Sequence, residues 1–261
     1  MRRIHFHVLI PLVAATVSLP AVAQDTAEQG PPAGQVNDAD DALAINGGAT
    51  LVSQYRFRGI GLSDEKPAVQ GTINLTHESG FYAGVWGSSL DGFGELGGSN
   101  LELDLYGGYR KQVAEGITLD AGLLYYAYPD STGGKFEFFE PFANVSGSLG
   151  PVTAKAGAAF APAQDGIGGN SNIYLFNDNS LAIPGTPITL ISHLGWSRGD
   201  TTLTPGGEYL DWSLGATASW RNLTVGIAYV DTDIGDGAAR AAGASPDIVD
   251  SAVVLSLSAS F

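Results

Sequence analysis

The last stretch of the chain has a regular alternation of apolar and polar positions. Within residues 249–261 the apolar positions recur at every second residue, and the positions between them are mostly serine. One face carries Val253, Leu255, Leu257, Ala259 and Phe261, and the other carries Val254, Ser256, Ser258 and Ser260. A period of two predicts a β-strand with one apolar face and one small, polar face.

The same alternation recurs from residue 45 onward and predicts about twelve strands. The eleven earlier ones cover about 45–58, 68–77, 81–86, 100–111, 116–128, 137–149, 151–161, 172–182, 187–197, 208–220 and 221–231. The alternation is least regular in 172–182 and 187–197, where it breaks around 177–180 and 192–193. A soluble β-sandwich could show similar strands, but a terminal aromatic such as Phe261 is typical of the closing strand of an outer-membrane barrel.

The connections between these segments alternate in length, which separates the two architectures. Long links cover 58–66, 88–99, 128–135, 161–170, 198–207 and 232–248, and short links cover 78–80, 112–116, 149–151, 183–187 and 220–222. Outer-membrane barrels have long extracellular loops and short periplasmic turns. The sequence therefore predicts an all-β fold, an antiparallel transmembrane β-barrel of about 12 strands with short periplasmic turns and longer extracellular loops.

Two segments precede the predicted barrel of residues 45–261. Residues 1–23 have the pattern of a secretory signal peptide, with Arg2 and Arg3, an apolar core over 8–19 and small residues before position 24. Residues 24–44 are acidic and aperiodic, which predicts a disordered periplasmic leader. No stretch of about 18 apolar residues indicates a transmembrane helix.

Composition excludes several classes of function. Without the signal the chain has ten basic side chains against 27 carboxylates, a net charge of −17, which argues against nucleic-acid binding. The chain has no cysteine, so neither disulfides nor cysteine-based metal sites are available. We predict no catalytic residues, no metal site and no cofactor.

Charged side chains on the polar faces are the candidate functional residues. With both termini periplasmic, Arg56 and Arg58 are expected near the outer end of the first strand, facing four carboxylates at the same height of the lumen. These carboxylates are Glu102, Asp104, Glu140 and Asp211, and a smaller set at the periplasmic end comprises Asp120 and Lys155. Charges facing lipid would cost several kcal/mol near the midplane, so inward placement is expected. These residues either line a charged constriction for small solutes or form ion pairs that fill the lumen.

Other chemistry-bearing residues have simpler interpretations. His193 is a lone imidazole beside Ser192, and no Asp or Asn is expected to orient it, so a structural role is favoured. A lipid hydrolase would need Ser, His and a polar orienting group on the lipid-facing wall, and adjacent strand residues face opposite sides. Trp86, Trp212 and Trp220 are expected in the aromatic girdles at the membrane interfaces.

Several segments resemble the TorF family of putative porins. The most specific are Tyr-Arg-Phe-Arg-Gly at 55–59 and Gly-Phe-Tyr-Ala-Gly-Val-Trp at 80–86, supported by 102–109, 208–216 and 228–234. The resemblance covers about 45–261 and implies an outer-membrane protein of proteobacterial type. It implies no established substrate and carries over no catalytic residue.

Three functions remain open at this point: a weakly cation-selective porin for passive diffusion of small hydrophilic solutes, a structural or surface-binding barrel with a plugged lumen, and, third, an outer-membrane lipid hydrolase. The expected location is the cell outer membrane. The expected partners are outer-membrane lipid and lipopolysaccharide, small solutes, and the barrel-assembly machinery acting on Phe261.

Overall fold

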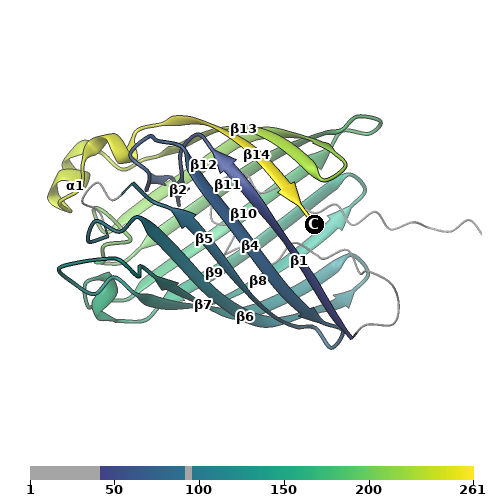
Figure 1. Ribbon diagram of the computed structural model, residues 1–261, viewed down its shortest axis with the longest axis horizontal. Helices are drawn as coiled ribbons and strands as arrows, with labels where there is room; N and C mark the ends of the chain where they lie inside the picture. The colour runs from purple at the N-terminus through teal and green to yellow at the C-terminus, as the bar shows by residue number, and fades with distance from the viewer. Residues whose placement is uncertain (1–41, 92–95) are drawn as a thin grey trace, which may run out of the picture.

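The chain forms a closed antiparallel barrel of twelve strands, which confirms the predicted fold class (Figure 1). The computed structural model describes residues 42–91 and 96–261, so the expected signal peptide and almost all of the expected leader lie outside the described residues. The wall strands are β1 (Leu43–Val52), β4 (Ala68–His77), β5 (Phe81–Ser89), β6 (Leu101–Ala114), β7 (Ile117–Ala127), β8 (Phe138–Leu149), β9 (Val152–Ala161), β10 (Asn172–Ala182), β11 (Ile188–Arg198), β12 (Glu208–Trp220), β13 (Leu223–Thr232) and β14 (Ala252–Ser260).

Each wall strand pairs with its neighbours in sequence, and β14 pairs with β1 to close the ring. At this seam Leu51 lies opposite Leu257. Phe261 extends the seam by one residue, because its backbone N–H donates to the Gly47 carbonyl at 2.9 Å and its carbonyl accepts from Gly47 at 3.0 Å. Closure leaves no strand edge of the wall unpaired, as a sheet crossing hydrocarbon requires.

Connections at the two ends of the barrel differ in length as the sequence predicts. The turns at one end have two to five residues, and the longer loops gather at the other end (Figure 1). The longest loop joins β13 to β14 and contains α1 (Asp236–Ala241) and the 3₁₀ turn η2 (Pro246–Val249); a further 3₁₀ turn, η1 (Asp165–Ile167), lies between β9 and β10. No helix in the described part of the chain is both long enough and apolar enough to cross a bilayer.

Alternation along the strands turns apolar side chains outward. Ile45, Leu214 and Val225 are each more than half exposed, while the positions between such residues are buried or half-buried. The outer face is therefore an apolar belt and the inner face a lumen lined by polar, small and aromatic side chains.

Two expectations about this alternation are wrong. The first strand ends at Val52 rather than at 58. Residues 53–67, which we call the inner segment, leave the wall, and within this segment residues 55–61 turn into the barrel and are buried. Trp86 is 3% exposed and packs on Tyr55 with ring centroids 5.5 Å apart, so it lies in the lumen and not in a girdle. Trp220, by contrast, is 66% exposed at the short-turn end, as a girdle residue would be.

Candidate functional site

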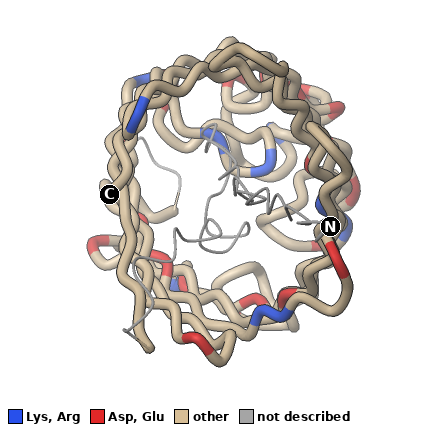
Figure 2. The backbone as a smooth tube through the Cα atoms, turned by 90° about the vertical axis from the view of Figure 1, so that its right-hand side faces the viewer, with Lys and Arg blue, Asp and Glu red and all other residues tan. Residues whose placement is uncertain are grey.

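A short hairpin inside the barrel sets the shape of the lumen. β2 (Arg56–Phe57) and β3 (Ile60–Gly61) pair antiparallel, and all four residues are buried. Arg58 and Gly59 form the turn with φ of 46° and 81°, the left-handed conformation that two-residue hairpin turns favour at both central positions. A Cβ on Gly59 would lie 2.3 Å from Cγ2 of Thr232, so the close approach to β13 also requires glycine. Figure 2 looks along the barrel, and described chain, drawn in tan and blue, is visible within the ring of wall strands.

Arg58, at the tip of this hairpin, makes a fully buried ion pair. Its Nη2 lies 2.6 Å from Oε2 of Glu140 on β8, and both side chains are about 1% exposed. Its guanidinium carbon lies 4.0 Å from the ring centroid of Tyr174 on β10, a cation–π geometry. The Tyr126 hydroxyl donates to the same Glu140 oxygen at 3.4 Å. The tip of the inner segment is thus fixed to β7, β8 and β10.

Arg56 has a different role from the one expected. Its Nη1 donates to the backbone carbonyls of Gly59 (3.1 Å), Ile248 (3.1 Å) and Asp250 (2.8 Å), and its Nε donates to Gln54 (2.8 Å). Among the described residues, none of the four carboxylates expected to face Arg56 bonds to it. The structure instead uses Arg56 to join the inner segment to the β13–β14 loop.

The three other carboxylates of the predicted outer layer lie inside the barrel on two strands. Glu102 and Asp104 are on β6, opposite Ser88 and Trp86 of β5, and their side chains are fully buried. Asp211 is on β12 and is also fully buried. The structure therefore places all four carboxylates in the lumen and brings Glu140 together with Arg58 of the expected pair.

Asp211 belongs to a polar network that the sequence analysis missed. His193 on β11 lies between two carboxylates, with Nδ1 2.6 Å from Asp178 and Nε2 2.9 Å from Asp211. The Tyr174 hydroxyl is 2.9 Å from the same Nε2 and 3.1 Å from Asp211. The expectation that no Asp or Asn orients His193 is wrong, because two do. Both ring nitrogens face carboxylates, which suits an imidazole that donates at both positions.

Asp120 and Lys155, the charges expected at the periplasmic end, have different partners. Asp120 accepts from Arg110 at 2.8 Å and from the Tyr82 hydroxyl at 2.7 Å. Lys155 lies 3.7 Å from Asp178, and so joins the histidine network. Asp120 and Lys155 both face the lumen, as predicted, but they do not bond to each other.

The sequence did contain a signal for the missed residues, namely the breaks in alternation around 177–180 and 192–193. Asp178 and His193 are register partners on β10 and β11, and Arg110 and Asp120 are register partners on β6 and β7. Strand register cannot be counted across a pair whose boundaries are uncertain, which was the case for β10 and β11. The regions where polarity appeared irregular therefore contained the densest part of the network.

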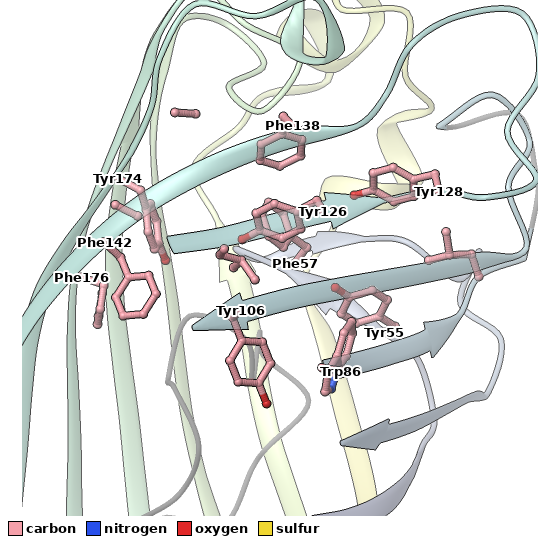
Figure 3. Close-up of a cluster of buried hydrophobic side chains, with 14 of the residues drawn as sticks. Tyr55, Phe57, Trp86, Tyr106, Tyr126, Tyr128, Phe138, Phe142, Tyr174 and Phe176 are labelled. Carbon is pink, nitrogen blue, oxygen red and sulfur yellow. The ribbon is translucent and has the colours of Figure 1, made fainter. Parts of the chain in front are cut away.

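Aromatic side chains pack around the hairpin in the lumen. Figure 3 shows Phe57 of the inner segment among rings contributed by the walls, and Tyr126 stacks on Phe138 with centroids 4.2 Å apart. Phe57 meets Tyr126 edge-on at 5.8 Å. The buried cluster includes Tyr55, Phe57, Trp86, Tyr106, Tyr126, Tyr128, Phe138, Phe142, Tyr174 and Phe176. The inner segment is thus packed rather than loosely hanging in the lumen. No group of three or more His, Asp or Glu suited to a metal ion occurs among the described residues.

The closed barrel has an apolar outer face and a polar, charged interior, a pattern that transmembrane β-barrels also have. Solved structures of porins share the fold. The KdgM porin aligns with a TM-score of 0.55 at 7% identity, covering 83% of this chain and 98% of that one. The NanC porin aligns with a TM-score of 0.53 at 10% identity, covering 84% and 99%. KdgM in complex with disordered oligogalacturonate aligns with a TM-score of 0.53 at 6% identity, covering 83% and 97%.

At the level of sequence, residues 37–261 match the model of the family described as "Bacterial protein of unknown function (Gcw_chp)". The chain belongs to this family. No curated protein matches it.

Proposed function

We propose that the protein is an outer-membrane channel for passive diffusion of small hydrophilic solutes, narrowed by the inner segment. The observation that carries this proposal is the hairpin of Arg56–Gly61, which buried charges hold against several walls of a closed, polar lumen. The apolar belt of the outer face supports membrane placement. The signal pattern of residues 1–23 and the TorF resemblance support export to the outer membrane.

The charge of the lumen supports a weak preference for cations. Six carboxylates face inward among the described strands and the inner segment, against four permanent cations and His193, which adds a fifth positive charge when both of its ring nitrogens donate, so the net charge is −2 without it and −1 with it. The carboxylates are Glu102, Asp104, Asp120, Glu140, Asp178 and Asp211, and the cations are Arg56, Arg58, Arg110 and Lys155. A lumen with excess negative charge attracts cations and repels anions.

A second function, a structural or surface-binding barrel with a plugged lumen, is favoured by one observation. The aromatic cluster and the Arg58–Glu140 pair pack buried side chains around the hairpin in the lumen. In such a barrel the inner segment would be a fixed plug and the acidic loops would be the functional surface.

Conductance in planar bilayers separates these two functions. We would compare the natural barrel with a variant in which a Gly-Ser linker replaces residues 55–62, and with a control in which the exposed residues 132–135 are replaced in the same way. A channel conducts in its natural form, and the first replacement raises its conductance while the control does not. A silent natural barrel that conducts only after the first replacement would support the plug and contradict the channel.

The lipid-hydrolase alternative has less geometric support. His193 faces the lumen, with its ring nitrogens on Asp178 and Asp211, and Ser192 is the next residue on the opposite face of β11. We therefore expect Ser192→Ala and His193→Ala to leave any lipid-hydrolysing signal unchanged. Loss of a reproducible esterase activity in either variant would favour the enzyme.

The partners that we propose follow from the two surfaces of the barrel. The belt would contact outer-membrane lipid and lipopolysaccharide, the lumen would contact small solutes, and the barrel-assembly machinery would recognise Phe261. Phe261 is suited to recognition because its ring is 74% exposed at the end of the closing strand.

A further inference from the structure

The apolar belt contains one polar patch near the middle of the wall. On β10 the outward positions run Leu175, Asn177, Asn179 and Leu181, alternating with inward residues such as Phe176 and Ser180. Asn179 lies opposite Ser192 of β11, which also faces outward. We call Asn177, Asn179 and Ser192 the amide patch.

No other wall strand carries such a group in its middle. Among the described residues, the outward positions at the centres of the other wall strands are aliphatic, aromatic, glycine or proline. Outward polar side chains occur elsewhere near strand ends, at Ser89, His77, Lys111, Arg198, Glu208 and Asp231. The amide patch also explains why the polarity pattern is irregular at 177–180 and 192–193 although the strands continue unbroken.

The patch is partly satisfied by internal hydrogen bonds. Nδ2 of Asn177 donates to the Lys155 carbonyl at 2.9 Å, and Nδ2 of Asn179 donates to the Asn177 side-chain oxygen at 2.7 Å. The same Nδ2 lies 3.4 Å from Oγ of Ser192. An amide offers two donor hydrogens and an oxygen with two lone pairs, so these contacts leave hydrogen-bonding capacity directed outward.

Lipid tails cannot use that capacity. Polar side chains in the hydrocarbon region are costly unless another group bonds to them, so a group of three on one wall indicates contact with protein at that depth. The neighbouring strand is suited to such contact, because Ala154 lies opposite Asn179 and Ala156 lies opposite Asn177. These small side chains let a second backbone approach closely.

We propose that the β9–β11 wall is the contact surface between two copies of this chain, related by a twofold axis parallel to the barrel axis. All copies enter the membrane in one orientation, so the amide patch of a second copy lies at the same depth. Amides are both donors and acceptors, so the patch is complementary to itself, as a twofold contact requires. The proposal rests on the membrane placement proposed above, but not on conduction.

Cross-linking tests the proposal cleanly because the chain has no cysteine of its own. We would oxidise membranes containing Ala156→Cys and, as the control, Ile73→Cys. Ile73 is an outward residue in the middle of β4, which lies across the closed ring from β10. We expect a cross-linked product at twice the monomer mass for Ala156→Cys and only monomer for Ile73→Cys. Equal yields from the two variants, or an adduct with a different protein at Ala156→Cys, would overturn the proposal.

A second variant tests the role of the polar groups. The triple substitution Asn177→Leu, Asn179→Leu and Ser192→Ala should abolish the dimer in mild detergent while the barrel still migrates differently before and after boiling. A dimer that survives the triple substitution would contradict the proposal. If the natural barrel is inserted in membranes but monomeric, the dimer proposal is contradicted and the proposed location is not. If the chain is absent from the membrane fraction, both proposals are contradicted.

Discussion

At the scale of single residues, several charges of the lumen bond to specific partners and do not form the expected outer layer of two arginines facing four carboxylates. Arg58 bonds to Glu140, Arg110 bonds to Asp120, and His193 lies between two aspartates. Moving such charged groups out of water costs free energy, and the attraction within each pair offsets that cost only while both members are present.

The Arg58–Glu140 pair provides a test at this scale. We expect Arg58→Gln and Glu140→Gln each to lower the free energy of unfolding by about 3–5 kcal/mol, because each leaves a buried charge without its main partner. The double variant should lose clearly less than the sum of the two. Urea unfolding of the refolded barrel measures all three, and Lys135→Gln is the control because its pair with Asp165 is exposed. Additive losses would contradict a direct coupling of the two side chains.

Gly59 and Gly133 allow the close approach of the hairpin turn to be separated from its backbone conformation. Both have positive φ, 81° and 82°, but a Cβ would meet Thr232 only at Gly59 and nothing within 4 Å at Gly133. Alanine should therefore cost roughly 1–2 kcal/mol of stability at Gly133 and clearly more at Gly59. Equal effects in urea unfolding would mean that the inner segment moves away without penalty.

At the scale of elements, the wall could be predicted and the inner segment could not. Alternation identified every wall strand, including β10 and β11, because each has one apolar face turned outward and one face turned toward the lumen. Residues 53–58 continue the same alternation through Tyr55 and Phe57, so the pattern predicted a strand running on into the loop. What turns these residues inward is packing against Trp86 and Tyr126 and the bonds of Arg56, and these contacts join residues distant in sequence.

The seam between β1 and β14 carries a prediction at this scale. Deleting Phe261 removes two backbone hydrogen bonds to Gly47, whereas Phe261→Ala keeps both and removes only the ring. We expect the deletion to reduce the fraction of heat-modifiable barrel formed during refolding, and Phe261→Ala to refold better than the deletion. In cells both should lower assembly if the ring is the recognised group. Full assembly of Phe261→Ala in cells would show that the assembly machinery does not need the ring.

At the scale of the whole molecule, the architecture could be predicted from the sequence, but the pairing inside the lumen could not. Loop lengths and the alternation of apolar and polar positions can be read directly along the sequence, and together they predicted the closed barrel. Pairing depends on which walls the folded inner segment reaches. Arg56 illustrates the difference, because it lies in the lumen as expected but bonds to the carbonyls of Ile248 and Asp250.

The charge of the entire lumen yields the last prediction, a modest preference for cations. Reversal potentials across a salt gradient should show it, and it should grow at low salt because the screening length is about 10 Å at 0.1 M and longer below that. Asp104→Asn and Asp211→Asn should weaken the preference, because each removes a buried negative charge from the lumen. Arg56→Gln should strengthen it. Asp165→Asn is the control, since this side chain is 72% exposed on an outer loop, and it should change little. A clear anion preference in the natural protein would contradict the excess of negative charge assigned to the lumen.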